Sequence, residues 1–333
     1  MTKTTRPSIL RRALSVLGLS LKDGARMGLR TVASLLVVMV PVIVVMTVLE
    51  ATGLLPRLAW LFSGAMQLLG LPGDAALVFI SGAAVNLYSA VAVAANLSLS
   101  FKQMTVLAIL CLDAHNLPVE CAIQKQAGTG ALAMLSVRLL TGFAAALVFS
   151  RLIPNTPAWT APATHASLAA PAERTLAAFL WAKLLANAIF LGKIVLIVMA
   201  LMILVELLRR TGALRILTVL MRPVTWLAGL PAEATFTVMA SSTLGLAFGA
   251  GLVIAEAKRG ELTPEGQFRT NVFIGTTHSL LEDTMLFAVI GGSILWIVVG
   301  RLAIGGLAVR LFSLGRRAWL AAAGRRATDE SPP

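Results

Sequence analysis

The chain has little charge, few aromatic side chains and almost no cysteine. Among its 333 residues, 13% are charged and 6% are aromatic, and the two cysteines are Cys111 and Cys121. Both cysteines lie in apolar stretches, so the sequence does not predict the disulfide framework of a small secreted domain. A soluble domain of this length needs a charged surface, and the scarcity of charge excludes an ordinary soluble protein.

Apolar residues take the place of charge, at 58% of the chain with a mean hydropathy of +0.86. A bilayer core about 30 Å thick is crossed by about 20 apolar residues in a helix. The sequence therefore predicts an all-α, polytopic membrane protein whose main partner is the lipid bilayer. The expected spanning runs are 31–49, 75–101, 128–150, 194–205, 234–255 and 291–309.

The net charge of +13 lies mostly at the two ends of the chain. Seven basic residues precede the first apolar run and five follow the last: Lys3, Arg6, Arg11, Arg12, Lys22, Arg26 and Arg30, then Arg310, Arg316, Arg317, Arg325 and Arg326. This pattern is typical of cytoplasmic termini, and we expect a multi-pass protein of a bacterial inner membrane with both ends inside. Nucleic acid is not an expected partner, because no aromatic interleaving or known fold signature accompanies the charge.

The two halves of the chain overlay on one another. Gly-Leu-Pro occurs at 70–72 and 229–231, and Thr-Gly at 52–53 and 211–212, both pairs 159 residues apart. Farther along, four positions recur at an offset of 163: His115 and His278, Glu120 and Asp283, Gly128 and Gly291, Arg138 and Arg301. Matches at constant offsets indicate an internal repeat.

Charge placement gives the expected layout. We expect a basic lead-in (1–30), a first repeat (31–154), an external linker (155–175), a second repeat (176–312) and a basic tail (313–333). Each repeat would have about three spanning helices, which makes the two repeats inverted. That count requires the polar segments 103–126 and 271–290 to be broken or re-entrant, without a net crossing.

Inverted repeats place discontinuous helices at the bilayer midplane, where polar groups can bind a solute. Pro118 predicts a helix break near Asn116. The second copy has no proline, and Gly275 is its weakest point. The candidate substrate-binding residues are His115, Asn116, Glu120, His278, Ser279, Glu282 and Asp283, together with Asn86 and Thr243 on the preceding apolar runs. Hydrogen bonds between helices would also explain the last two.

Two arginines stand inside apolar runs. Arg138 and Arg301 are each about ten residues into such a run, where a charge costs several kcal/mol unless it is paired. We expect each arginine to pair with a carboxylate, and the candidates are Asp113, Glu120, Glu282 and Asp283. These pairs would hold the repeats together, or set the charge of a site for a cation or proton, and both roles are compatible.

His115 and His278 also permit a metal site, since imidazole with carboxylate suits iron or zinc. On a continuous helix His278 and Glu282 would share a face, being spaced i, i+4. There is no HExxH sequence and no paired-cysteine spacing. The sequence therefore favours a structural or solute-binding role for both histidines, with no metal and no cofactor predicted.

The order of these motifs resembles the nucleoside recognition (Gate) domain family. The motifs are a Gly-Leu-Pro turn, a run rich in small residues, and His-Asn-Leu-Pro-x-Glu or His-Ser-Leu-x-Glu-Asp before a glycine. The family includes spore maturation proteins A and B and the Gate regions of the ferrous-iron permease. The resemblance covers 26–154 and 185–311 and implies a tandem-Gate protein. It leaves the substrate open, and no GxxxxGK[ST] loop for a coupled GTPase is present.

The resemblance and the polar breaks together imply a transporter-like protein. It would bind or translocate a small polar solute, nucleoside-like or an ion, at the interface of the two repeats. The alternatives are a non-transporting component of membrane assembly or signalling, and a divalent-metal permease. Catalysis is not expected, since GxSxG, HExxH and a pair of aspartates on facing spans are all missing. A homo-oligomer is left open.

Overall fold

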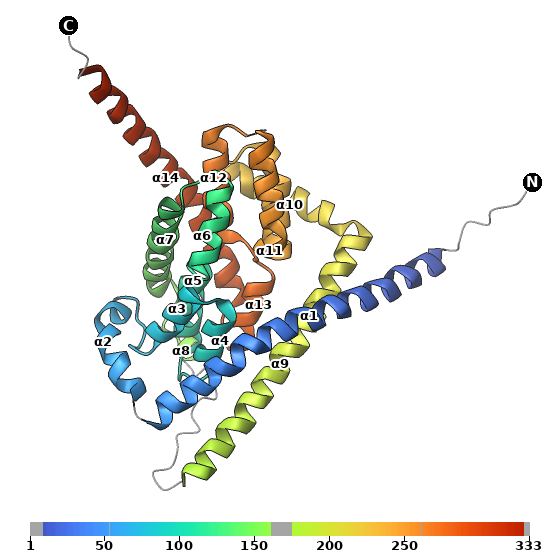
Figure 1. The fold of residues 1–333 in the computed structure, drawn as a ribbon, viewed down its shortest axis with the longest axis vertical. Helices are drawn as coiled ribbons and strands as arrows, with labels where there is room; N and C mark the ends of the chain where they lie inside the picture. The colour runs from blue at the N-terminus through green and yellow to red at the C-terminus, as the bar shows by residue number, and fades with distance from the viewer. Residues whose placement is uncertain (1–8, 53, 161–174, 261, 330–333) are drawn as a thin grey trace, which may run out of the picture.

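The computed structural model describes residues 9–52, 54–160, 175–260 and 262–329, and throughout these ranges the chain is helical with short connections (Figure 1). The helices are α1 (Ile9–Ala51), α2 (Leu54–Leu68), α3 (Ala75–Ala84), α4 (Leu87–Ala94), α5 (Phe101–Asp113), α6 (Leu117–Gln126), α7 (Ala131–Leu152), α8 (Pro157–Thr160), α9 (Leu176–Thr211), α10 (Ala213–Ala228), η1 (Ala232–Ala234), α11 (Thr235–Arg259), α12 (Pro264–Thr277), α13 (Glu282–Val289) and α14 (Ile294–Asp329). The all-α architecture is confirmed.

Among the residues that the structure describes, four helical segments are long and apolar enough to cross a membrane. They are Phe101–Gln126, Ala131–Leu152, Leu180–Thr211 and Ile294–Arg316. A bilayer admits backbone only as helices whose hydrogen bonds are satisfied internally, and these segments meet that condition over most of their length. The chain is therefore a multi-pass membrane protein.

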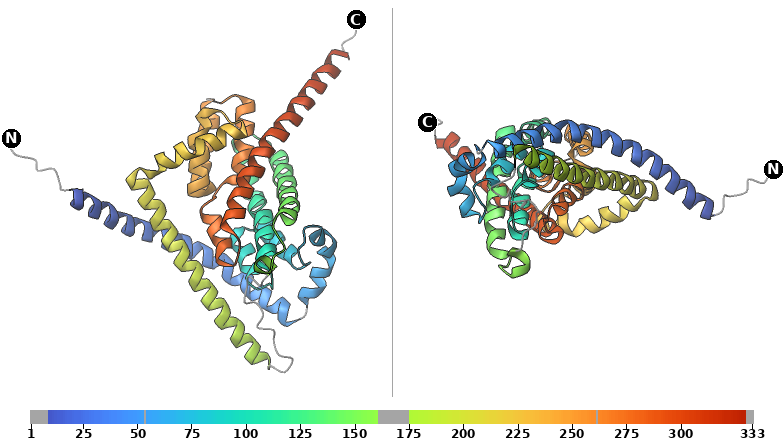
Figure 2. Two further views of the ribbon diagram at one scale, coloured as in Figure 1. Left: turned by 180° about the vertical axis from the view of Figure 1, so that it is seen from behind. Right: turned by 90° about the horizontal axis from the view of Figure 1, so that it is seen from below.

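The same order of elements occurs in both halves. Each half has a long helix (α1 or α9), an amphipathic helix (α2 or α10) and an interrupted segment, which is α3–α4 in the first half and α11, non-helical at Gly245 (φ 77°), in the second. A buried, a short and a closing helix follow (α5, α6, α7 or α12, α13, α14). In Figure 1, α1 runs downward and α9 upward, and α7 and α14 also run in opposite directions. The two long helices pack against each other and cross obliquely on one flank of the bundle (Figure 2).

The expected span over 75–101 is wrong. Helices α3 and α4 fold back on each other, with the Ser89 hydroxyl donating to the Ser81 carbonyl at 2.8 Å. The approach is so close that a Cβ on Gly82 would lie 2.9 Å from the Ala90 Cβ. Asn86 ends the continuous helix because its side chain accepts a hydrogen bond from the Ser89 N–H at 3.0 Å and caps α4.

The segment from 103 to 126 also differs from expectation. Instead of lying without a crossing, it forms α5 and α6, which together make the candidate span Phe101–Gln126. Sequence polarity is a poor guide here because polar side chains of this segment, among them Asp113, His115 and Glu120, are buried inside the protein and do not face lipid. In the first half, the expected span 75–101 is therefore the segment that folds back, and the expected non-crossing segment 103–126 is the candidate span.

Helix ends do not coincide with the expected outer boundaries. Helix α1 runs through residue 30 and α14 runs through residue 312, so neither the basic lead-in nor the basic tail is separated from its repeat by a break. Within the expected linker, α8 is a short helix, and 161–174 lie outside the described residues.

The Gly-Leu-Pro turns end the amphipathic helices in both halves. Helix α10 stops at Gly229, whose φ of 77° lies in the left-handed region, and α2 is followed by Gly70 with a φ of 71°. Glycine adopts this conformation without the steric cost that a Cβ brings. The two turns therefore have the same backbone geometry as well as the same sequence.

Two buried helices form the centre of the bundle. Helix α5 is buried from Met104 to Asp113 and packs on α7, while α12 is buried from Thr270 to Thr277 and packs on α14. Helices α7 and α14 also contact each other. Both central helices end near the middle of the molecule, where the functional site begins.

Candidate functional site

The first helix break lies where Pro118 predicts it. Helix α5 ends at Asp113, α6 begins at Leu117, and Asn116 between them has a left-handed φ of 46°. Its backbone N–H leaves the helix and donates to the Gly82 carbonyl of α3 at 2.8 Å. The break is thus held by another interrupted segment of the same half.

The second break lies between α12 and α13, and not at Gly275. Ser279 has a φ of 49°, and its N–H donates to the Ser241 carbonyl of α11 at 3.0 Å, the position 159 residues after Gly82. Gly275 stays inside α12, where a Cβ would lie 2.6 Å from the Gln124 Nε2 atom. Its role is to admit a neighbouring side chain.

The break also separates two residues that were expected to share a helix face. His278 caps the end of α12 and Glu282 begins α13, so the two residues do not lie on one helix and do not share a helix face. His278 instead faces the first half.

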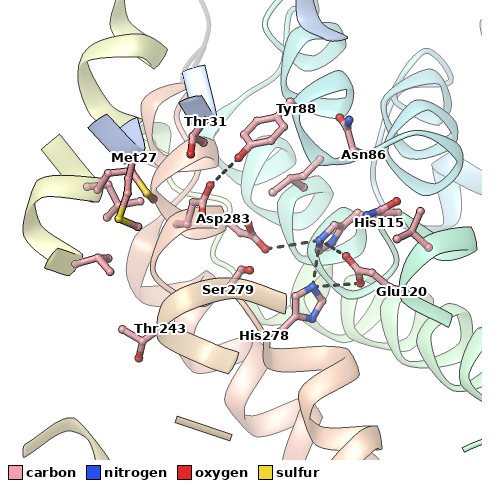
Figure 3. A pocket seen from close by; sticks show the side chains of 18 of the residues that line it. Met27, Thr31, Asn86, Tyr88, His115, Glu120, Thr243, His278, Ser279 and Asp283 are labelled. Carbon is pink, nitrogen blue, oxygen red and sulfur yellow. Dashed lines mark hydrogen bonds and ion pairs between the residues drawn. The ribbon is translucent and has the colours of Figure 1, made fainter. Parts of the chain in front are cut away.

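The two breaks bring two histidines and two carboxylates together (Figure 3). The His115 Nε2 and Glu120 Oε1 atoms are 3.2 Å apart, the His278 Nε2 and Glu120 Oε2 atoms are 3.2 Å apart, and the two Nε2 atoms are 3.3 Å apart. Asp283 Oδ2 lies 3.7 Å from His115 Nε2. All four side chains are buried. We call His115, Glu120, His278 and Asp283 the break cluster.

The other nitrogen of each imidazole is held by the backbone. His115 Nδ1 is 3.1 Å from the Leu112 carbonyl oxygen, and His278 Nδ1 is 2.9 Å from the Ile274 carbonyl oxygen. A carbonyl only accepts, so both Nδ1 atoms donate. In neutral rings the lone pairs are then on the Nε2 atoms, which point into the cluster. His115, Glu120 and His278 could hold a metal ion, since their ligand atoms all lie within 4.8 Å of one another.

Arg138 supports the first break. Its Nη1 atom lies 2.5 Å from Glu120 Oε2, and its Nε donates to the Asp113 carbonyl at 2.9 Å. Both arginine and glutamate are buried, and a buried guanidinium needs such partners. The structure thus gives Arg138 a carboxylate partner, as the sequence suggests.

Arg301 supports the second break differently. Its Nε donates to the Thr276 carbonyl at 3.1 Å, and its Nη2 donates to the carbonyls of His278 at 2.8 Å and Leu112 at 3.3 Å. Its partners are thus carbonyls freed at the helix ends, and among the described residues it forms no ion pair. The Asp113 carboxylate oxygens are buried and make no hydrogen bond within the described part of the chain, so the expected pairing of Asp113 is not observed.

A cavity of about 630 Å³ opens beside the break cluster. All nine residues expected to bind substrate line it: His115, Asn116, Glu120, His278, Ser279, Glu282, Asp283, Asn86 and Thr243. Asp113, Arg138 and Arg301 lie behind the cavity wall and do not line it. Volume and mixed lining are typical of a site for a small molecule.

Tyr88 is a cavity residue that the sequence analysis does not assign to the site. Its hydroxyl donates to Glu282 Oε1 at 2.6 Å and so joins α4 of the first half to α13 of the second (Figure 3). The available signal was weak: it is the chain's single tyrosine and stands two residues after Asn86.

The long helices supply the remaining wall of the cavity. Met27 and Thr31 of α1 line it together with Glu206 and Arg209 of α9. Glu206 accepts from Arg209 at 2.8 Å and from Arg210 at 2.6 Å, and Arg210 also pairs with Asp23 of α1. This pairing ties the two long helices together. This pairing could have been predicted from the sequence, because Arg209 and Arg210 follow Glu206 at the i+3 and i+4 positions of a helix.

Comparison with known proteins places the first half in a family. Residues 32–149 match the family model Gate, described as nucleoside recognition, and this confirms the resemblance for the first of the two ranges, 26–154. The uncharacterized membrane protein YvoD of Bacillus subtilis (strain 168) is 29% identical over 273 residues, which cover 80% of this chain and 86% of YvoD. No solved structure matches the chain. The matched range contains both Asn86 and the whole first break.

Proposed function

We propose that this protein, whose residues 32–149 match the Gate (nucleoside recognition) family model, binds a small polar solute in the cavity between its two halves and carries the solute across the membrane. The solute is nucleoside-like or ionic. The observation that carries the proposal is the convergence of two helix breaks, one from each half, on a single cavity.

The chemistry of the lining supports a polar solute. Each helix break turns the chain at a left-handed residue, Asn116 or Ser279, and both of these residues line the cavity. Side chains of Asn86, Glu282 and Thr243 add amide, carboxyl and hydroxyl groups to the wall. Polar groups at membrane depth are costly, and their concentration around one cavity is expected of a binding site.

We further propose that the halves are inverted repeats and that both termini are cytoplasmic. The opposite directions of α1 and α9 in Figure 1, and the matching breaks at offsets of 159 and 163 residues, support the inversion. The basic termini support the orientation. Such symmetry lets a solute site open alternately to either side by rocking one half against the other.

Ligand binding is the first test. The purified protein is screened by thermal shift against nucleosides, nucleobases and organic acids, since a ligand of the folded state raises its midpoint by mass action. Uptake of each hit is then measured in proteoliposomes. The expected result is a solute that both stabilises the protein and accumulates in the vesicles.

A pair of matched substitutions locates the site. Glu282→Gln changes a cavity residue, whereas Glu265→Gln changes a partly buried glutamate of the same half that pairs with Arg269 and Arg316 away from the cavity. The first variant should weaken solute binding at least tenfold and the second should leave it unchanged. Equal binding by both variants, or a solute that binds without any uptake, would contradict the transport proposal, and the latter would favour a non-transporting component.

The orientation has a separate test. Single cysteines at Thr52 and Thr211, both exposed, are introduced into a chain whose native cysteines are replaced by alanine. A maleimide that does not cross membranes should label one position from outside and the other only after permeabilisation. Labelling of both from the same side would refute the inversion and leave the binding proposal standing.

A further inference from the structure

We propose that His115, Glu120 and His278 bind one divalent transition-metal ion, of the zinc and iron class, at the base of the cavity. The inference rests on the proposed function in that the ion would lie where the solute enters. It assigns to the break cluster a ligand that the solute-binding proposal does not require.

The geometry of the three ligand atoms supports the ion. A tetrahedral ion with metal–ligand distances of about 2.0–2.1 Å keeps its ligands roughly 3.3 Å apart. The separations are 3.2 Å from His115 Nε2 to Glu120 Oε1, 3.2 Å from His278 Nε2 to Glu120 Oε2, and 3.3 Å between the Nε2 atoms. The two imidazole nitrogens therefore stand at the spacing of two corners of such a site, and the Glu120 carboxylate directs one oxygen at each of them at a similar distance. With one ligand atom taken from each side chain, the three atoms lie within 4.8 Å of one another.

The hydrogen bonds of the imidazoles direct lone pairs at the same point. Because both Nδ1 atoms donate to backbone carbonyls, the Nε2 atoms of His115 and His278 are acceptors facing each other and a carboxylate. Three acceptors at this spacing repel unless a cation lies among them. A single shared proton satisfies one pair of atoms at a time, whereas a metal ion satisfies all three.

The surroundings match those of a metal ligand set. A backbone carbonyl on the second nitrogen of a ligating histidine fixes the ring and its tautomer, and both rings have one. Arg138 holds Glu120 Oε2 at 2.5 Å and so orients the carboxylate while Oε1 remains directed at His115. Asp283 Oδ2, 3.7 Å from His115 Nε2, accepts no hydrogen bond within the described residues and could take the fourth position, or leave it to water or solute.

The formal charge of the region also favours a cation. Four carboxyl groups, those of Asp113, Glu120, Glu282 and Asp283, form or adjoin the breaks together with two guanidinium groups, those of Arg138 and Arg301. Counted as ionised, with neutral histidines, they leave two negative charges that a divalent ion balances. Imidazole nitrogens select Zn²⁺, Fe²⁺ or Co²⁺ over Mg²⁺ and Ca²⁺, which prefer oxygen ligands.

Metal titration of the full-length protein tests the site. The detergent-purified protein is stripped with chelator and titrated with Zn²⁺ by calorimetry and with Co²⁺ by visible absorption, which reports four-coordinate geometry directly. We expect one equivalent of each ion and no binding of Mg²⁺. A stripped protein that binds neither Zn²⁺ nor Co²⁺ would overturn the proposal.

Histidine variants assign the ion to the cluster. His278→Ala should weaken Zn²⁺ binding by on the order of 100-fold, and His115→Ala similarly, because each removes a direct ligand. His165→Ala, which changes the chain's remaining histidine outside the described residues, is the matched control and should bind as the parent does. Equal affinity in His278→Ala and His165→Ala would overturn the assignment. If an alanine variant fails to fold, His278→Gln keeps the bulk of the side chain and is expected to lose the Co²⁺ absorption.

The metal and the solute are separable in this experiment. Metal binding with no solute hit, and with no uptake of the metal ion into proteoliposomes, supports the ion site and contradicts the transport proposal. Solute binding by the stripped protein, with no metal binding, supports the transport proposal and contradicts the ion site.

Discussion

The two helix breaks share a backbone design and differ in their side chains. In each, an arginine Nε donates to a carbonyl 25 residues earlier: Arg138 to Asp113 and Arg301 to Thr276. Beyond that bond they diverge, since Arg138 pairs with Glu120 while Arg301 bonds only carbonyls within the described residues. The two repeats thus share the hydrogen bond from an arginine to the end of the central helix, and they differ in whether that arginine pairs with a carboxylate.

The difference between Glu120 and Asp283 follows from this. The two stand at equivalent positions, but the longer glutamate reaches the arginine of its own half and both histidines. Asp283 is one methylene shorter and lies near His115 of the other half. The carboxylate of the first break thus contacts three ionisable side chains, whereas that of the second lies near one.

The largest expected effect comes from removing the carboxylate that pairs with the buried Arg138. In metal-free buffer Glu120→Gln should lower the free energy of unfolding by about 3–5 kcal/mol, because it leaves the Arg138 charge buried and unpaired. Asp283→Asn should cost about 1 kcal/mol. Reversible unfolding in mixed micelles measures both, and equal losses would show that the breaks are energetically alike.

Substituting lysine for each of the two buried arginines should lower the free energy of unfolding by different amounts. Arg301→Lys should cost about 2–4 kcal/mol, because one ammonium cannot reach three carbonyls in the geometry of a guanidinium. Arg138→Lys should cost about half as much, since lysine can still pair with Glu120 as a point charge. The same unfolding assay applies, and a larger loss at Arg138 would reverse the assigned roles.

The glycines beside the central helix ends offer a milder comparison. A Cβ on Gly305 would lie 2.6 Å from the Thr277 Cγ2 atom, whereas one on Gly142 would lie 3.3 Å from the Asp113 Cβ atom. Gly305→Ala should therefore cost about 1–3 kcal/mol and Gly142→Ala less than about 1 kcal/mol. Thermal midpoints of the two variants check the order, which the opposite ranking would contradict.

The smallest effect is expected at the proline. Pro118→Ala should change the free energy of unfolding by less than about 1 kcal/mol and leave the break in place, because the second half breaks without a proline. Hydrogen exchange of the amides that follow Asn116 reports on the break. Protection of a continuous helix in the variant would mean that Pro118 alone makes it.

Much of this arrangement was accessible from the sequence. Low charge and long apolar runs predict a polytopic helical protein, and constant offsets reveal the repeated positions of His115 and His278. The position of the first break could be predicted from Pro118, because a proline disfavours helix locally and is visible in the sequence without tertiary context.

The rest depends on contacts between distant segments. The second break is set by hydrogen bonds from Ser279 and Leu280 to α11, which no local pattern encodes. The fold-back at Asn86 depends on the close approach of Gly82 to Ala90. Hydropathy carries no information on such a contact and predicts a span over 75–101. The meeting of His115 with His278 required the positions of both halves in space.

A double-mutant cycle between Tyr88 and Glu282 tests whether the two halves meet at one site. Their hydrogen bond of 2.6 Å joins α4, which follows the interruption of the first half, to α13, which follows the break of the second. Tyr88→Phe and Glu282→Ala should show a coupling energy of about 1 kcal/mol in the unfolding assay. Additive losses, within about 0.3 kcal/mol, would mean that the two segments do not touch and that no shared site exists.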